Sequence, residues 1–202
     1  MGSNFRVLGA GVWGLAFSDY LLELNHNVEV FCRDVDTCNK KLNDLDLSNL
    51  SNKDIKQLDR LDDYKASDAI NIIATNSKGF DALIAKHLNY FHEAKQLVSL
   101  TKGFDHESGL LFSEKIEAIF GVNLKYGLIS GPSFAKDLSI RKKMSVSFAS
   151  NDKQLTDVMI KSTKSSHFEM IATPHIYHIE IAGILKNIAA IICAMADNYF
   201  GK

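Results

Sequence analysis

The chain has 202 residues, which is enough for one large domain or for one domain and part of another. Its 46% apolar residues predict a substantial core, and its net charge of −1 gives no electrostatic reason to expect a nucleic acid or an anionic membrane surface as a partner. No continuous run of about 18 apolar residues predicts a membrane span. Cys32, Cys38 and Cys193 lack the spacing of a metal site, so we expect reduced thiols in a cytoplasmic protein without a bound metal.

A glycine-rich motif, G-x-G-x-x-G, lies at residues 9–14. The elements predicted around it are a strand over 5–8, a helix over 15–24 and a second strand over 27–32. This order is typical of a dinucleotide-binding βαβ unit. Gly9 permits the tight turn, Gly11 lets the backbone approach a pyrophosphate, and Gly14 lets the helix pack close to the sheet. The alternative is a glycine-rich turn in another kind of α/β protein.

Strand-like and helix-like segments continue to alternate along the chain. We expect short helices and loops over 36–63, strands over 69–74, 96–100, 126–130, 145–149 and 167–172, and helices over 80–91, 110–120, 155–164 and 176–200. Alternation of this kind predicts an α/β fold in which helices cover both faces of a mostly parallel, doubly wound sheet.

Polar residues follow several of the predicted strands. Asn76 and Ser77 follow the third strand, Lys102 follows the fourth, and the fifth leads into 131–133. Ligands bind beyond the carboxyl ends of the strands in open α/β sheets, so these residues are candidates for a site. Lys102 is either an ordinary surface lysine or a contact to a phosphate or a carbonyl group.

The segment 176–200 is apolar around most of its helical axis, which is typical of a helix inside a bundle. Glu180, Lys186 and Asn187 lie within it. A buried lysine has a lowered pKa and can act as a general base, whereas a lysine that extends to solvent keeps an ordinary pKa. The sequence leaves both interpretations of Lys186 open.

Four motifs together resemble bacterial NAD(P)-dependent glycerol-3-phosphate dehydrogenase. They are Gly-Ala-Gly-x-Trp-Gly at 9–14, Lys102-Gly103, Gly-Pro-Ser-Phe-Ala at 131–135 and Glu-x-x-Gly-x-x-Lys-Asn at 180–187. The resemblance implies a Rossmann-type cofactor domain over 1–174, followed over 175–202 by the first helix of an all-helical substrate domain. It also implies interconversion of sn-glycerol 3-phosphate and dihydroxyacetone phosphate with NADP or NAD, feeding glycerophospholipid synthesis.

The resemblance also implies roles for individual residues. Lys186 is similar to the family's proton acceptor, and Lys102 is similar to a lysine that contacts both substrate and cofactor. The residues that match substrate-binding positions are Lys102, Gly131, Ser133, Lys186 and Asn187. Those that match cofactor-binding positions are Gly9, Gly11, Val12, Trp13, Gly14, Arg33, Lys102 and Ala135. A cation at Arg33 favours the 2′-phosphate of NADPH, whereas Asp34 favours the free hydroxyl of NADH.

The chain departs from the family pattern in two respects. Asn76 stands where the family usually has a proline after the third strand. The family's enzyme also continues into a helical domain that supplies an aspartate and an Arg-Asn pair, so we expect an incomplete active site that binds dinucleotide with little turnover. We expect the apolar helix either to fold back on the sheet domain or to pair with a second copy in a homodimer.

Two other functions remain open. The first is a non-catalytic module that binds NAD(P). The second is another dehydrogenase of the same superfamily, such as a ketopantoate reductase, against which the Gly-Pro-Ser-Phe-Ala motif argues.

Overall fold

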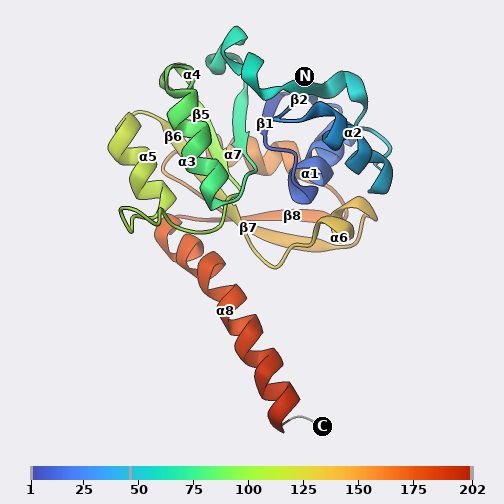
Figure 1. Cartoon of the computed structure of the whole chain (residues 1–202), viewed down its shortest axis with the longest axis vertical. Helices are drawn as coiled ribbons and strands as arrows, with labels where there is room; N and C mark the ends of the chain where they lie inside the picture. The colour runs from blue at the N-terminus through green and yellow to red at the C-terminus, as the bar shows by residue number, and fades with distance from the viewer. Residues whose placement is uncertain (1, 46, 201–202) are drawn as a thin grey trace.

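The computed structural model describes residues 2–45 and 47–200, which form one eight-stranded sheet with helices on both faces (Figure 1). The strand order is β3-β2-β1-β4-β5-β6-β7-β8, and every neighbouring pair is parallel except β6 with β7. The strands are β1 Asn4–Leu8, β2 Asn27–Cys32, β3 Ile55–Gln57, β4 Ile70–Ile73, β5 Gln96–Ser99, β6 Lys125–Ser130, β7 Met144–Ser150 and β8 Phe168–Thr173. The α-helices are α1 Val12–Glu23, α2 Val35–Asp44, α3 Ser77–Lys86, α4 Leu88–Glu93, α5 Phe112–Phe120, α6 Ala135–Ser139, α7 Lys153–Thr163 and α8 Ile176–Phe200. Short 3-10 turns are η1 Asn52–Asp54, η2 Leu58–Asp63 and η3 Ala66–Asp68.

The sheet separates two hydrophobic cores. Successive side chains of a strand point to opposite faces, so Val7 packs with residues of α1, α6 and α7, whereas Leu8 packs with residues of α3, α4 and α5. Ile72 and Ile73 divide between the two cores in the same way. Burial on both faces explains why the central strands are continuous apolar runs rather than alternating ones. The predicted fold class is confirmed.

The strand order positions the candidate site. The chain leaves β1 toward β2 on one side, and it leaves β4 toward β5 on the other, although β1 and β4 are neighbours in the sheet. A crevice forms at such a reversal because the two connections diverge beyond the carboxyl ends of the strands. The loop after β1 is the glycine-rich motif, so the motif lies beside the loops that follow β4 and β5.

Two local predictions were wrong, and one helix was not predicted. The segment 36–63 contains the short strand β3, which extends the sheet beyond β2. The helix predicted over 80–91 is divided into α3 and α4, because the backbone of His87, with φ −116° and ψ 37°, leaves the helical region. The short helix α6 after residue 134 was not predicted.

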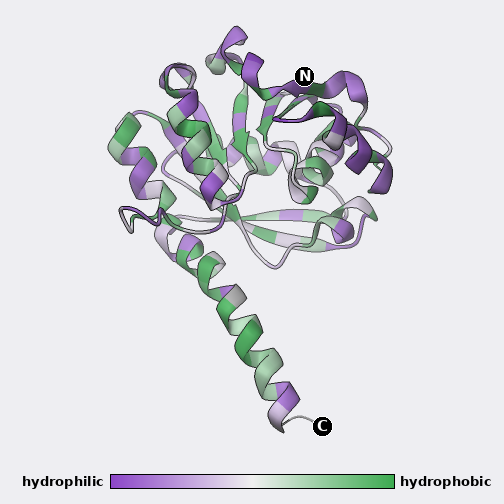
Figure 2. Ribbon diagram, in the orientation of Figure 1, coloured by the Kyte–Doolittle hydropathy of each residue, from purple (hydrophilic) through white to green (hydrophobic). Residues whose placement is uncertain are grey.

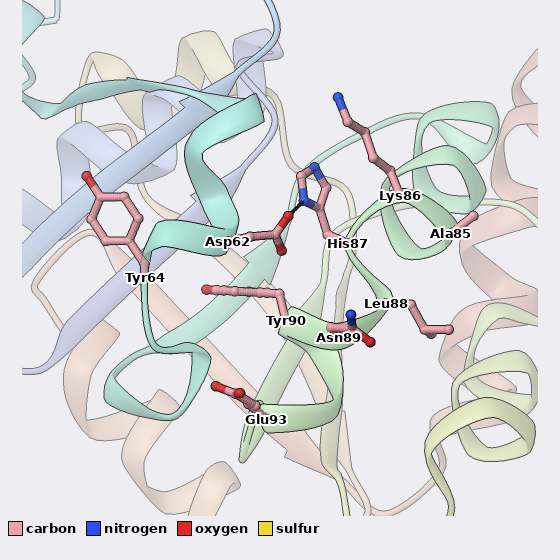
Figure 3. Close-up of a pocket in the computed structure, with 9 residues that line it drawn as sticks. All are labelled: Asp62, Tyr64, Ala85, Lys86, His87, Leu88, Asn89, Tyr90 and Glu93. Atoms are coloured by element: carbon pink, nitrogen blue, oxygen red, sulfur yellow. Dashed lines mark hydrogen bonds and ion pairs between the residues drawn. The ribbon is translucent and has the colours of Figure 1, made fainter.

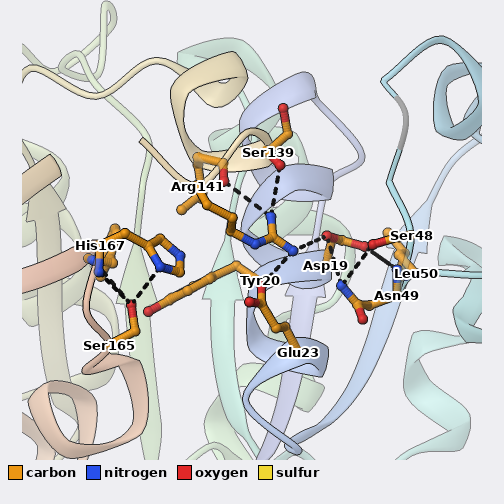
Figure 4. Close-up of polar contacts among 12 residues, drawn as sticks. Asp19, Tyr20, Glu23, Ser48, Asn49, Leu50, Ser139, Arg141, Ser165 and His167 are labelled. Atoms are coloured by element: carbon orange, nitrogen blue, oxygen red, sulfur yellow. Dashed lines mark hydrogen bonds and ion pairs between the residues drawn. The ribbon is translucent and has the colours of Figure 1, made fainter. Parts of the chain in front are cut away.

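A buried carboxylate connects three parts of the first core (Figure 4). Asp19 on α1 is 1% exposed, and its oxygens accept hydrogen bonds from the backbone N–H groups of Asn49 and Leu50 at 2.6 and 2.9 Å. Arg141 lies 3.3 Å from the same carboxylate and 2.5 Å from Glu23. A buried charge is tolerated only when it is paired and hydrogen-bonded, so these contacts hold the segment after α2 and the loop after α6 against α1.

Helix α8 extends away from the sheet domain instead of folding back on it (Figure 1). Only its first part contacts the domain, chiefly at β6 and β7. Figure 2 shows apolar residues along the rest of the helix, and those with large exposed side chains are Ile181, Leu185, Ile188, Ile191, Ile192 and Met195. The expectation that α8 folds back on the sheet is therefore wrong, and the alternative of pairing with a second copy remains.

By length and average composition, α8 is nevertheless one weak candidate for a membrane span among the described residues. Ile176–Tyr199 has a mean hydropathy of 1.8 and is long and apolar enough to cross a bilayer by length and composition. The same helix carries Glu180 and Lys186, both of which contact the sheet domain. One helix of this kind does not establish a membrane protein, because apolar helices of other origin meet the same criteria.

Candidate dinucleotide and substrate site

The glycine loop is packed tightly against the end of β4. Gly9 has φ +120°, and a Cβ atom there would lie 2.7 Å from the carbonyl oxygen of Ala74. A Cβ atom on Gly14 would lie 2.7 Å from the Gly9 carbonyl oxygen and 2.9 Å from the Ala74 side chain. Both positions therefore require glycine for the loop and α1 to pack in this way. A Cβ atom on Gly11 would make only an ordinary contact, 3.7 Å from the Ala74 carbonyl oxygen, and Gly11 lines the open cavity described below.

The N-terminus of α1 offers amide groups to that open space. Gly11 is the N-cap, no side chain in the described part of the chain caps the helix, and its first turn has no acidic residue. The first backbone N–H groups of a helix have no partner inside the helix and carry a partial positive charge. An N-terminus without a side-chain cap, beside a glycine-rich turn, fits a bound pyrophosphate.

A cavity of about 370 Å³ opens beside this helix end. The residues that line it are Gly11, Val12, Trp13, Gly14, Ala74, Thr75, Asn76, Leu100, Lys102, Ile129, Ser130 and Ser133. They come from the glycine loop and from the ends of β4, β5 and β6. The cavity therefore lies at the strand-order reversal, where sequence analysis placed the site.

Lys102 lies in the loop after β5 and is half-buried. The preceding residue anchors this loop, because the Thr101 hydroxyl donates to the Thr75 carbonyl oxygen at 3.0 Å and the Thr101 N–H donates to the Ser99 hydroxyl at 3.1 Å. Burial, and to a smaller extent the positive charge of Lys186, lowers the pKa of Lys102 to about 8. Lys102 is therefore not an ordinary surface lysine.

Lys186 reaches the same region from α8. Its Nζ atom donates to the Gly131 carbonyl oxygen at 3.3 Å, in the loop after β6. Gly183 makes this approach possible, because a Cβ atom there would lie 2.7 Å from the Ser130 hydroxyl and 3.8 Å from Lys102 Cγ. The half-buried position of Lys186 corresponds to neither sequence interpretation completely, since its amine neither extends freely to solvent nor is fully enclosed.

A second contact links α1 to the loop after β6. Trp13 Nε1 donates to the Ser133 hydroxyl at 3.2 Å, and the Trp13 ring packs on Phe17 with ring centroids 5.0 Å apart. This contact joins the predicted cofactor residue Trp13 to the predicted substrate residue Ser133. The two classes of predicted residue therefore share one cavity.

Arg33 and Asp34 lie at the end of β2, outside the lining of this cavity. The Arg33 side chain is exposed, and its carbonyl oxygen accepts from Gln57 at 2.8 Å. The Asp34 carboxylate is occupied as the N-cap of α2, because it accepts from the Thr37 N–H at 3.0 Å and from the Thr37 hydroxyl at 2.6 Å. Hydrogen bonds from Thr37 also lower the pKa of Asp34.

Other predicted residues are placed less directly. Ala135 is the first residue of α6, which follows the loop after β6, and it does not line the cavity. The side chain of Asn187 lies outside the described residues. Sequence analysis missed Lys41, whose Nζ atom lies 3.4 Å from the Ala10 carbonyl oxygen of the glycine loop. It also missed Thr75 and Ser130, although each follows or ends a strand at the same edge as Lys102.

A separate cavity of about 420 Å³ lies among η2, α3 and α4, away from the glycine loop (Figure 3). His87 Nδ1 lies 2.9 Å from the Asp62 carboxylate, and Lys86 pairs with Asp59. Nε2 of the buried His87 has no hydrogen-bond partner among the described residues. This cavity shares no lining residue with the one beside the glycine loop, so it is not part of the same site.

The lowered pKa of Lys102 predicts a stability cost at neutral pH. In the folded protein this pKa is about 8, below its usual 10.5, so the unfolded chain binds the proton more readily. The cost is fully present below about pH 8 and disappears as the pH rises toward 10.5. Lys102→Met should raise the free energy of unfolding at neutral pH by about 1–2 kcal/mol, after allowance for solvent screening, and the gain should shrink at high pH.

Urea denaturation across this pH range measures the effect. Lys164→Met is the matched control, because Lys164 is exposed and should show no pH-dependent gain. An equal gain for both variants, or a gain for Lys102→Met that does not depend on pH, would contradict the explanation.

Comparison with known proteins agrees with this geometry. A family model described as the N-terminus of NAD-dependent glycerol-3-phosphate dehydrogenase matches residues 4–156. A protein of Francisella tularensis subsp. novicida named glycerol-3-phosphate dehydrogenase, NAD(P)+, is 31% identical over 206 residues, covering 97% of this chain and 60% of that protein. Its counterpart in Francisella tularensis subsp. tularensis is 30% identical with the same coverage.

Solved structures give the same result. Glycerol-3-phosphate dehydrogenase from Coxiella burnetii matches with a TM-score of 0.81 and 25% identity, covering 97% of this chain and 61% of that one. The enzyme from Plasmodium falciparum matches with a TM-score of 0.78 and 22% identity, which supports the fold alone. This chain spans about 60% of the length of the curated relatives it matches.

The matched interval contains the glycine loop, Lys102 and the loop after β6, which together form the cavity described above. The chain belongs to the family of NAD-dependent glycerol-3-phosphate dehydrogenases, whose N-terminal region it matches.

Proposed function

We propose that this chain supplies the dinucleotide site and the catalytic lysines of an NAD(P)-dependent dehydrogenase that interconverts sn-glycerol 3-phosphate and dihydroxyacetone phosphate. One observation carries the proposal: Lys102, in the loop after β5, and Lys186, on α8, lie close together beside the glycine-loop cavity. Two ammonium groups close enough to affect one another, one of them lining the cavity, favour a phosphorylated substrate and an oxyanion. The names of the relatives support the same reaction.

The cofactor is assigned to the glycine loop and the elements around it. The amide groups at the start of α1 bind the pyrophosphate, and Gly9, Gly11 and Gly14 shape the turn. Val12, Trp13, Lys102 and Ala135 complete the proposed cofactor contacts. Arg33 faces the 2′-phosphate of NADPH, and the occupied Asp34 carboxylate is poorly placed to bind the ribose hydroxyl of NADH. We therefore propose a preference for NADPH, with NADH also accepted.

The nicotinamide, when bound, accepts a hydride from C2 of glycerol 3-phosphate or returns one to dihydroxyacetone phosphate. Lys186 takes the proton of the C2 hydroxyl in the oxidative direction and donates it to the developing alkoxide in the reductive one. Lys102 stabilises that oxygen as a cation and holds the substrate beside the cofactor. Gly131, Ser133 and Asn187 complete the proposed substrate contacts.

We also propose a division of the chain into a dinucleotide domain over 1–174 and the first helix of a substrate domain over 175–202. The start of α8 at Ile176 and its extension away from the sheet support this boundary. The three free cysteines, two of them buried, support a reducing compartment such as the cytoplasm. The product, glycerol 3-phosphate, would feed glycerophospholipid synthesis there.

The reaction is tested by following the oxidation of NADPH or NADH with dihydroxyacetone phosphate, and with ketopantoate as the competing substrate. In active protein, Lys186→Ala should lower turnover by roughly 10²–10⁴-fold, because a general acid–base group is lost, while NADPH affinity stays within a few-fold. Lys161→Ala, on the exposed side of α7, is the control.

Three outcomes would contradict these assignments. Turnover of Lys186→Ala close to that of the unaltered protein would remove Lys186 from the chemistry. Faster reduction of ketopantoate would replace the substrate. Tight NADPH binding without hydride transfer to either substrate, in protein that also carries the helical substrate domain, would favour a non-catalytic module.

The cofactor preference is tested at Arg33. Arg33→Ala should weaken NADPH binding by roughly 10–100-fold, because a charge-assisted hydrogen bond to the 2′-phosphate is lost, and should leave NADH binding unchanged. Isothermal titration calorimetry with each cofactor measures both affinities. Arg60→Ala, in η2, is the matched control for loss of one positive charge. An unchanged NADPH affinity in Arg33→Ala would show that Arg33 does not read the phosphate.

For the partners, we propose that two copies of the chain pair through α8. Its large exposed apolar side chains form a continuous surface, and such surfaces associate in water. Sedimentation equilibrium should give a dimer, and a double variant, Ile188→Glu with Ile192→Glu, should give a monomer because two charges would enter the contact. Asp197→Asn on the same helix should remain dimeric. A monomer at all concentrations, or a dimer in the double variant, would contradict pairing through this surface.

A further inference from the structure

Glu180 is buried on a helix that is otherwise mostly exposed. Its side chain is 2% exposed, although many residues of α8 lie in solvent. One carboxylate oxygen, Oε1, accepts from the backbone N–H groups of Phe112 and Ser113 at 2.9 and 3.4 Å. The other, Oε2, accepts from the Ser113 hydroxyl at 2.5 Å. The first turn of α5 therefore holds the carboxylate of a residue that lies 67 positions later in the chain than Ser113.

Three contacts attach the base of α8 to the sheet domain. Glu180 binds α5, Gly183 packs against Ser130 at the end of β6, and Lys186 reaches the Gly131 carbonyl oxygen. The contact of Gly183 depends on close approach, and the hydrogen bond of Lys186 is long at 3.3 Å and only half-buried. Two of the hydrogen bonds of Glu180, at 2.9 and 2.5 Å, are shorter than that of Lys186, and Glu180 is buried, so its contacts are the strongest of the three.

We propose that Glu180 is a positioning residue, whose hydrogen bonds to α5 hold α8 against β6 and so keep Lys186 beside Lys102. The inference rests on the proposed function in treating these two lysines as the catalytic pair. Lys186 lies six residues after Glu180, within two turns, and a rigid helix transmits the placement of one to the other.

Glu180 caps the first turn of α5 from a distant part of the chain. Glu114 on α5 accepts from the Leu111 N–H at 2.8 Å, whereas Glu180 accepts from the N–H groups of Phe112 and Ser113. Burial raises the pKa of Glu180, against the hydrogen bonds from Ser113 and Phe112 that lower it. Among the described residues, the titratable groups whose pKa is coupled to that of Glu180 are Glu114 on α5, Tyr126 on β6 and Tyr177 on α8, and none of these three is a cation. The carboxylate is thus held in place by hydrogen bonds rather than by an ion pair.

The lowered pKa of Lys102 reports the position of α8 without any need for turnover. The Lys102 pKa is lowered by burial and by the charge of Lys186. Helix α8 carries Lys186, and it contributes to the burial because Gly183 packs close to the Lys102 side chain. The titration is followed in the whole 202-residue chain through the carbon-13 shift of the Lys102 Cε atom, assigned with Lys102→Arg. In the unaltered chain, Lys102 should titrate with a pKa of about 8.

Glu180→Ala should move the Lys102 pKa toward 10.5 by roughly one unit or more, because the helix and its lysine are released. Glu180→Gln should keep most of the lowered value, since its amide oxygen still accepts from the backbone of α5. Glu114→Ala, which removes the hydrogen bond between Glu114 and the Leu111 N–H at the same end of α5, should leave the Lys102 pKa unchanged. If Glu180→Ala loses its helical circular dichroism, Ser113→Ala provides the same test with a smaller shift, because it removes only the bond to Oε2.

The proposal is overturned if the Lys102 pKa is the same in Glu180→Ala and in the unaltered chain, or if Glu114→Ala shifts it equally. An ordinary Lys102 pKa in the unaltered chain would overturn it as well, since Lys102 would then be neither buried by α8 nor affected by the charge of Lys186. The measurement contains no substrate or cofactor. Suppose that the dehydrogenase assay fails but the Lys102 pKa changes in the Glu180 variants as expected. The proposed reaction would then be rejected, and the positioning role of Glu180 would stand.

Discussion

The close approach of the Ala74 carbonyl oxygen to the glycine loop is the contact on which the rest of the site depends. β1 and β4 are neighbours, so the loops that follow them share one space at the edge of the sheet. A Cβ atom on Gly9 would meet this oxygen at 2.7 Å, and one on Gly14 would meet the Ala74 side chain at 2.9 Å. Any side chain at these two positions would move α1 outward and remove its amide groups from the cavity. The geometry of the cavity therefore depends on glycine at positions 9 and 14.

The second constraint is electrostatic. Lys102 and Lys186 carry like charges in a partly desolvated part of the protein, which is unfavourable for the folded state. Burial and the charge of Lys186 therefore lower the pKa of Lys102. Such a pair persists only if other contacts hold it, and the buried hydrogen bonds of Glu180 and the close packing of Gly183 lie on the same helix as Lys186. Sites that bind anions commonly accept this kind of cost, because the ligand removes it.

Much of the fold followed from local pattern. The alternation of strand-like and helix-like segments predicted a sheet covered on both faces, and Val7-Leu8 and Ile72-Ile73 do each divide between two cores. The errors arose where local pattern is weak. β3 has only three residues and exists because β2 offers it an edge, and the break at His87 falls inside an apolar period that continues through it. Lys41 was missed because nothing in its neighbourhood in sequence indicates that α2 turns it toward Ala10.

The sequence by itself determined the order of the elements, the glycine motif and the candidate lysines, because periodicity and turn residues are properties of neighbouring positions. Only the tertiary structure decided that Asp34 is occupied by Thr37, that Lys102 and Lys186 are close enough to affect one another, and that Glu180 reaches α5. Each of these depends on contacts between side chains and backbone whose partners are set by how helices pack on the sheet. The direction of α8 is likewise a tertiary property, since an apolar helix has the same sequence pattern whether it is covered or exposed.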